Sequence, residues 1–136
     1  MTIYALDTNI ISFMLKGEKK VSNAFLHAND DGHIFIIPIA VYYEIRRGLL
    51  AVNATVQIQA FKKLCDSFDV EEMNTEIWEK AAKIWAVLRK SGTPLGKDDG
   101  DIFIAAHCII HDYTLVTDNT GDFERIEGLK FVNWCK

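Results

Sequence analysis

Several features are missing from this sequence of 136 residues, and each absence argues against a class of protein. No apolar run approaches the length needed to cross a membrane, and the amino terminus lacks the basic and long apolar regions of a signal peptide. The three cysteines are scattered and form no Cys-x-x-Cys pair, so neither a zinc site nor a disulfide framework is indicated. A net charge of −4 is not typical of a protein that coats nucleic acid non-specifically. We therefore expect a cytoplasmic protein with reduced, mostly packed cysteines.

The composition that remains is typical of a globular domain with a buried core. Hydrophobic residues make up 49% of the chain and charged residues 25%, without a repeat or a low-complexity segment. A chain of this length most simply forms one domain, residues 1–136. Short apolar runs alternate with segments of helical periodicity, which predicts an α/β sandwich of three layers with a mostly parallel central sheet flanked by helices.

The expected elements follow from hydrophobic periodicity and from turn residues. Strands are predicted at 3–6, 33–37, 68–70, 113–117 and 131–134. Helices are predicted at 10–15, 22–28, 39–50, 54–64, 75–90 and 102–110. The segment 75–90 has the clearest amphipathic pattern, with Asn74 as its cap and with Trp78 and Trp85 expected in the core.

Acidic residues stand where these elements join. Asp7 follows the first strand, the loop 118–122 follows a later strand, and Asp101 opens the apolar helix 102–110. In a parallel sheet these junctions lie along the same edge, where ligands bind. Two carboxylates about 5 Å apart repel by roughly 3 kcal/mol at an effective dielectric near 20, and a bound divalent cation removes that penalty. Glu44, among apolar residues of the helix 39–50, is a further candidate, although a solvated position beside Arg46 and Arg47 is the alternative.

A set of ligands made only of carboxylates favours Mg²⁺, with Mn²⁺ as the alternative. The chemistry that such an ion supports is phosphodiester hydrolysis, in which the metal activates and orients a water molecule. The four histidines, His27, His33, His107 and His111, show no constellation in the sequence. We assign His107 to packing because it lies six residues beyond Asp101 and faces away from that acid on a helix.

Four motifs in order resemble a known family. They are Leu6-Asp7-Thr8-Asn9, Tyr43-Glu44-Ile45-Arg46-Arg47-Gly48, Asp101-Ile102-Phe103-Ile104-Ala105-Ala106-His107 and Leu115-Val116-Thr117-Asp118-Asn119-Thr120-Gly121-Asp122-Phe123. Together they resemble PIN domains, specifically the VapC-type toxins of bacterial toxin–antitoxin modules. The resemblance implies a PIN-like fold and a Mg²⁺-dependent endoribonuclease, usually dimeric, that is neutralised by a small VapB-like antitoxin.

The resemblance also implies roles for individual acids. Asp7 and Asp101 match the principal metal ligands, and Glu44 matches the third acid. The fourth is Asp122 or, in the same loop, Asp118. Because Gly96 lies farther from Asp101 than the family pattern has it, Asp99 is an alternative ligand, although the residues after Asp101 favour Asp101. Residues that would support these acids are Thr8, Asn9 and Asn119.

Three basic residues are candidates to contact RNA phosphates: Arg46, Arg47 and Lys97. For the two arginines, salt pairing on the helix surface is the favoured alternative. A rival function is a PIN-like domain that binds metal, RNA or a protein without cleaving. The presence of an acid at all the matched positions argues against this rival.

Overall fold

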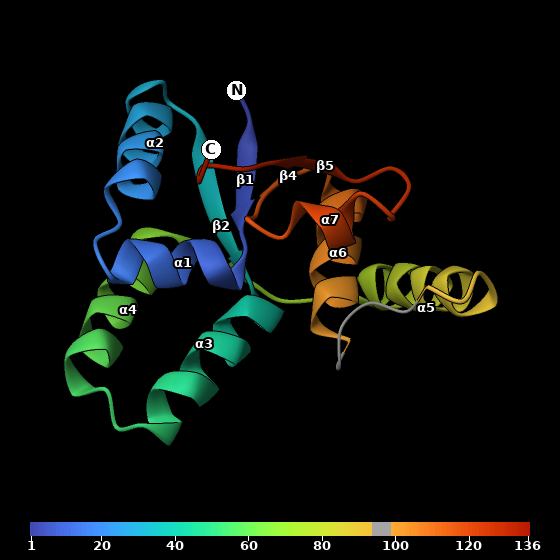
Figure 1. The fold of residues 1–136 in the computed structure, drawn as a ribbon, viewed down its shortest axis with the longest axis horizontal. Helices are drawn as coiled ribbons and strands as arrows, with labels where there is room; N and C mark the ends of the chain where they lie inside the picture. The colour runs from blue at the N-terminus through green and yellow to red at the C-terminus, as the bar shows by residue number, and fades with distance from the viewer. Residues whose placement is uncertain (94–98) are drawn as a thin grey trace.

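The computed structural model describes residues 1–93 and 99–136, which form a central sheet with helices on both sides (Figure 1). The candidate RNA contact Lys97 lies outside the described residues, as does Gly96, whose spacing from Asp101 differs from the family pattern. The strands are β1 Ile3–Leu6, β2 Ile34–Pro38, β3 Asp69–Glu71, β4 Thr114–Val116 and β5 Lys130–Val132. The helices are α1 Thr8–Leu15, α2 Lys19–Asp30, α3 Ile39–Ala51, α4 Thr55–Ser67, α5 Thr75–Lys90, α6 Gly100–His111 and α7 Thr120–Phe123.

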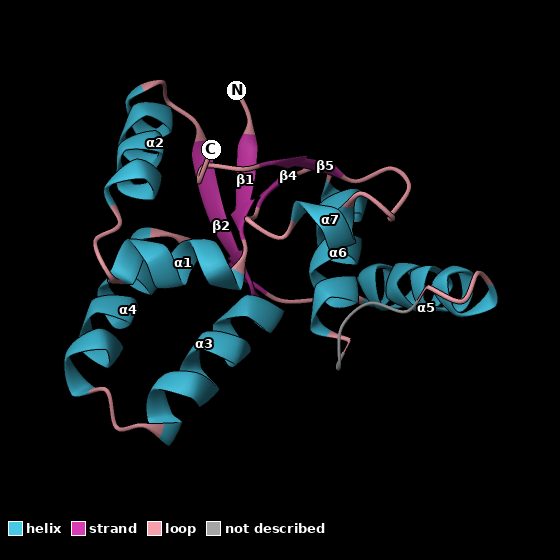
Figure 2. Cartoon of the chain, in the orientation of Figure 1, coloured by secondary structure: helices cyan, strands magenta, loops and turns pink. Residues whose placement is uncertain are grey.

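The sheet has the order β3-β2-β1-β4-β5, and every pairing in it is parallel. β1 lies at its centre, with Ala5 opposite Ile36 of β2 and Leu115 of β4. Because the strands all point the same way, their carboxyl ends meet at one edge, as the sequence predicted. The strands are magenta in Figure 2, where β1 and β2 end beside the start of α1 and α3.

The predicted α/β sandwich is therefore confirmed, with a sheet that is wholly parallel among the described strands. The inner strands carry apolar residues with little alternation because helices cover both faces of the sheet. The aliphatic side chains of Ala5, Leu6, Ile37, Leu115 and Val116 have no exposed surface. No described helix is long and apolar enough to cross a membrane.

Helix α5 coincides with its prediction because sequence signals mark both of its ends. The side chain of Asn74 accepts a hydrogen bond of 2.9 Å from the backbone N–H of Ile77 at the amino end. Gly92, with a φ of 73°, follows the other end. The buried face of α5 packs against α6, but Trp78 and Trp85 are 48% and 44% exposed. The expectation that these two tryptophans belong to the core was wrong.

Two helices differ from the prediction. α2 begins at Lys19, before its predicted start at residue 22. The acidic segment 118–122 is not wholly a loop, because α7 begins at Thr120 and contains Asp122. The predicted helices 39–50 and 54–64 are present as α3 and α4, which form a helical hairpin with its turn around Asn53, away from the sheet (Figure 1).

Candidate active site

Asp7 connects the central strand to the first helix and is buried, with 3% of its surface exposed. Its Oδ1 accepts a hydrogen bond of 2.8 Å from the backbone N–H of Thr8, so the side chain caps α1. Burial raises the pKa of Asp7 to about 6, against the lowering effects of hydrogen bonds from Thr117 and Thr8. The nearby carboxylate of Glu44 raises that pKa further. The site thus contains a desolvated carboxylate whose negative charge is costly without a cation.

The second oxygen of Asp7 is held by the hydroxyl of Thr117, which follows β4. This hydroxyl donates a hydrogen bond of 2.7 Å to Oδ2 of Asp7 and accepts one of 3.0 Å from the backbone N–H of Asn119. Asn9 lies between the same elements: its Nδ2 is 3.5 Å from Oδ2 of Asp7, and its Oδ1 accepts a hydrogen bond from the N–H of Asp118. The ends of β1 and β4 are therefore joined by side chains as well as by the sheet.

Thr117 was not among the residues that the sequence singled out. Its signal was available, because the residue stands between a buried strand and an acidic segment. Thr8, Asn9 and Asn119, which the sequence did single out, all belong to this hydrogen-bonded group.

Glu44, on α3, comes to the same edge. Its Oε2 accepts a hydrogen bond of 2.8 Å from the hydroxyl of Thr8, so Thr8 binds both acids, Glu44 through its hydroxyl and Asp7 through its backbone N–H. Glu44 lines two cavities. One cavity, of about 300 Å³, is also lined by Tyr43, Arg47, Trp78, Phe103 and Asp99. The other, of about 310 Å³, lies between α1, α3 and α4.

The amino end of α6 faces Glu44 across the first cavity, which is lined by Asp99 and Gly100 as well. Asp99 is the residue that precedes α6, but its side chain makes no capping hydrogen bond. Asp101 lies in the first turn and is half-buried, where the positive end of the helix dipole favours a charged carboxylate. Asp101 is thus inside the helix and not at its N-cap position.

The two candidates for the fourth acid have different surroundings. Asp122, in α7, accepts hydrogen bonds of 3.0 Å from Nδ2 of Asn119 and 3.1 Å from Arg125. Because the N–H of Asn119 binds the Thr117 hydroxyl, Asp122 is connected to Asp7 through two residues. Asp118 is exposed, and its carboxylate accepts a hydrogen bond of 3.1 Å from Asn133.

The two arginines of α3 also differ. Arg47 stacks over the ring of Tyr43 at 5.1 Å and lines the first cavity together with Glu44. Arg46 is half-buried and close enough to Cys65 of α4 to lower the pKa of that thiol, although burial and Asp66 raise it overall. Only Arg47 of this pair lines that cavity, among the residues described.

The histidines correct a prediction. His107 is fully buried, as expected for packing, but its Nε2 lies 3.0 Å from Oε1 of Glu71, and its ring is 5.2 Å from that of His111. These residues form a cluster that the sequence reasoning missed, because Glu71 is distant along the chain. The spacing of His107 and His111, one helical turn apart, was the available signal.

Comparison with known proteins shows the family of this chain. The model of the PIN domain family matches residues 4–129. Ribonuclease VapC1 of Haemophilus influenzae is 29% identical over 98% of this chain and 99% of that protein. The tRNA(fMet)-specific endonuclease VapC of Salmonella typhimurium is 26% identical over 99% of this chain and 100% of that protein. A solved structure of VapBC-1 from nontypeable Haemophilus influenzae superimposes with a TM-score of 0.86 and 29% identity, covering 99% of this chain and 100% of that chain. The chain belongs to the PIN domain family.

Proposed function

We propose that this protein is a Mg²⁺-dependent endoribonuclease and the toxin of a VapBC-type toxin–antitoxin module. One observation carries the proposal: Asp7 is a buried carboxylate at the ligand-binding edge of a parallel sheet, with a pKa raised to about 6. The described neighbours that shift this pKa are Thr117, Thr8 and Glu44, and none of them is a cation. The names of the relatives, which are ribonucleases and a tRNA endonuclease, support the same reaction.

The donor set fits a hard divalent cation. Asp7 and Asp101 would hold Mg²⁺, or Mn²⁺, through carboxylate oxygens, with Glu44 and Asp122 as the further acids. When bound, the ion lowers the pKa of a coordinated water and offsets the negative charge that develops on the scissile phosphate.

The side chains of this chain position the acids for that chemistry. The Thr8 N–H and the Thr117 hydroxyl each fix one oxygen of Asp7, which leaves the remaining lone pairs of the carboxylate for a ligand. The Thr8 hydroxyl fixes one oxygen of Glu44, and the other oxygen orients the attacking water and accepts its proton. Arg47, beside Glu44 in the first cavity, contacts an RNA phosphate.

The partner is a VapB-like antitoxin, by analogy with VapBC-1 of Haemophilus influenzae. Its place is the cavity between α1, α3 and α4, next to the hairpin tip where the apolar side chains of Val52 and Val56 are exposed. Two copies of the chain form a homodimer. Co-expression with the antitoxin and sedimentation of the purified complex would test both statements.

Incubation of the purified chain with RNA tests the nuclease assignment. We expect cleavage with Mg²⁺, no cleavage with EDTA, and a loss of about 10²-fold or more in Asp7→Asn. Asp66→Asn, which changes an exposed acid on α4, is the matched control and keeps full activity. If the RNA stays intact with Mg²⁺, or if Asp7→Asn cleaves as well as the control, the proposal is wrong and the silent, binding-only domain replaces it.

A further inference from the structure

The carboxyl-terminal end of α6 carries a second cluster of titratable side chains that the proposed nuclease does not use. It consists of Glu71 at the end of β3, His107 and His111 on α6, and Tyr113 just beyond that helix. Asp101 and His111 are ten residues apart on one helix, so their backbones are about 15 Å apart along its axis. His111 is therefore nearly three helical turns from Asp101, although Glu71 ends a strand at the same edge of the sheet as Asp7.

The three ligand-type residues of the cluster converge. His107 and His111 are one turn apart and on one face of α6, a spacing that lets two imidazoles bind one metal ion. Glu71 approaches from the sheet, and one potential ligand atom from each of the three residues lies within 4.8 Å of the others. Small shifts of side chains would bring these atoms to the separations found around a tetrahedral ion.

The contacts of these residues also suit a metal site. The Nδ1 of His107 is buried and has no hydrogen-bond partner among the described residues. Tyr113 donates a hydrogen bond of 2.9 Å to Oε2 of Glu71. Tyr113 thus orients the carboxylate as an outer partner does around a metal site.

A purely structural hydrogen bond between Glu71 and His107 does not need His111. Yet the ring of His111 lies 5.2 Å from that of His107 and stacks on Tyr113 at 5.1 Å, which holds it beside the pair. His111 is exposed, so solvent and ions reach the cluster from its side.

We propose that Glu71, His107 and His111 bind one divalent transition-metal ion of the Zn²⁺ type. Two imidazoles and one carboxylate favour such an ion over Mg²⁺, which prefers oxygen ligands alone. Three protein ligands leave a fourth position for water or for a group from another molecule. The proposal does not depend on the nuclease assignment.

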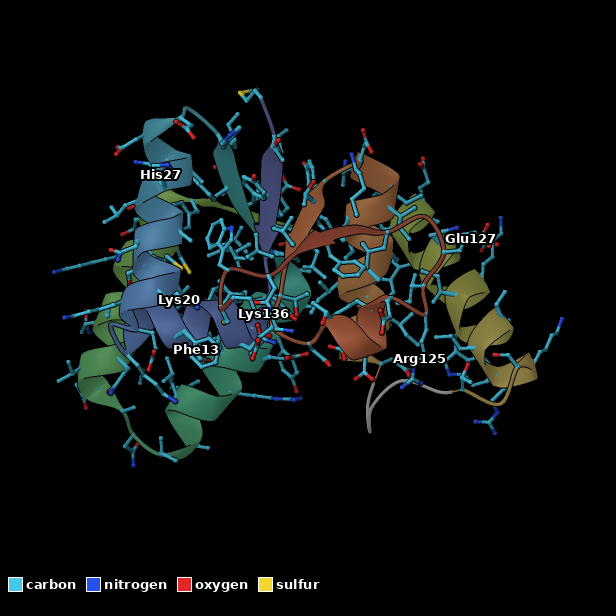
Figure 3. All side chains as sticks on the ribbon, turned by 45° about the horizontal axis from the view of Figure 1, so that its top comes forward. Phe13, Lys20, His27, Arg125, Glu127 and Lys136 are labelled. Atoms are coloured by element: carbon cyan, nitrogen blue, oxygen red, sulfur yellow. The ribbon has the colours of Figure 1, made fainter. Side chains whose placement is uncertain are left out.

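Calorimetric titration of the full chain with Zn²⁺, after removal of metal with EDTA, tests the site. We expect one saturable site per chain that survives in Asp7→Asn and in His27→Ala. His27 is the matched control because it lies on α2, across the molecule from α6 (Figure 3). His111→Ala and Glu71→Gln should each weaken the affinity by about tenfold or more. Unchanged affinity in both variants, or loss in Asp7→Asn, would overturn the proposal, as would the lack of saturable binding.

A second measurement uses the unaltered chain and so does not depend on how well a variant folds. In NMR spectra of the imidazole rings, Zn²⁺ should shift the signals of His107 and His111 and leave those of His27 and His33 in place. Shifts confined to His27 or His33, or no shift at all, would contradict the site.

Discussion

The hydroxyl of Thr117 donates a hydrogen bond of 2.7 Å to the carboxylate of Asp7, across 110 residues of sequence. Both side chains are buried, and the bond lowers the pKa of Asp7 against the larger raising effect of burial. Thr117 therefore helps to keep Asp7 ionised, which is the state that a metal ligand needs.

Replacing Thr117 by valine should reduce RNA cleavage at pH 7 by about 10- to 100-fold, since a hydrogen bond to a charged group contributes roughly 1.5–3 kcal/mol. The pKa of Asp7 rises further in this variant, so the acidic limb of the pH–rate profile moves to higher pH. The control is Thr114→Val, which changes the first residue of β4, the strand that Thr117 follows. An unchanged profile in Thr117→Val would show that the hydroxyl does not act through Asp7.

Asp7→Asn should stabilise the metal-free protein at neutral pH. The pKa of Asp7 is about 6 in the folded chain, against an ordinary value of 3.8 that we take for the unfolded chain. This difference means that the ionised carboxylate lowers the free energy of unfolding by roughly 3 kcal/mol. Because the folded chain binds the proton of Asp7 more tightly than the unfolded chain does, this destabilisation is fully present above pH 6 and disappears as the pH falls towards 3.8. Urea unfolding in EDTA at pH 7.5 and pH 4.5 measures this difference.

The difference in the free energy of unfolding between Asp7→Asn and the wild type should thus be smaller at pH 4.5 than at pH 7.5. Added Mg²⁺ should stabilise the wild type and not Asp7→Asn. An Asp7→Asn protein that is less stable than wild type at pH 7.5 in EDTA would contradict the cost assigned to the buried charge.

Asp122 and Asp118 should differ in their effect on activity. Asp122→Asn should lower RNA cleavage by about tenfold or more, because Asp122 is connected through Asn119 to the Thr117 hydroxyl. Asp118→Asn should change it by less than about threefold, because the exposed carboxylate binds Asn133 instead. Single-turnover cleavage of one RNA by both variants compares the two acids. A larger loss of activity in Asp118→Asn than in Asp122→Asn would make Asp118 the fourth acid.

Arg47 and Arg46 form a matched pair for RNA affinity. Arg47→Ala should weaken RNA binding, with a smaller slope of affinity against salt, because Arg47 lines the cavity that contains Glu44. Arg46→Ala should leave that slope unchanged, since Arg46 lies near Cys65. Filter binding of RNA to the Asp7→Asn background over a range of salt concentrations compares the two without cleavage. Equal losses in both variants would remove Arg47 from its proposed role.

Local signals in the sequence predicted most of the fold. α5 was predicted at its observed bounds because Asn74 and Gly92 mark its ends and its apolar face has a helical period. α7 was missed because a helix of four residues has too little periodicity to be recognised. The exposure of Trp78 and Trp85 could not be read from their helical spacing, since the width of the face that α6 covers is a property of the tertiary structure.

The sequence proposed the acids of the candidate site but not the hydrogen bonds that hold them. The junctions between predicted elements indicated Asp7, Asp101 and the loop 118–122, and the helical pattern indicated Glu44. The family resemblance added a role for each acid and pointed to Asp122 within that loop. The roles of these acids remain predictions. The hydrogen bonds from Thr117 to Asp7 and from Thr8 to Glu44 depend on the lateral order of the strands and on the placement of α3. The contact between Glu71 and His107 could not be predicted for the same reason, because it joins the edge strand β3 to α6, which lies much later in the sequence.

Glu44 borders both the cavity shared with Arg47 and the one between α1, α3 and α4. A molecule that fills one cavity and changes the position of this carboxylate also changes the affinity of the other cavity for its ligand. The coupling is reciprocal and of equal size in both directions. If the proposed antitoxin sits among α1, α3 and α4, it can therefore lower the affinity for RNA without covering the cavity shared with Arg47, and saturating RNA would weaken antitoxin binding by the same factor.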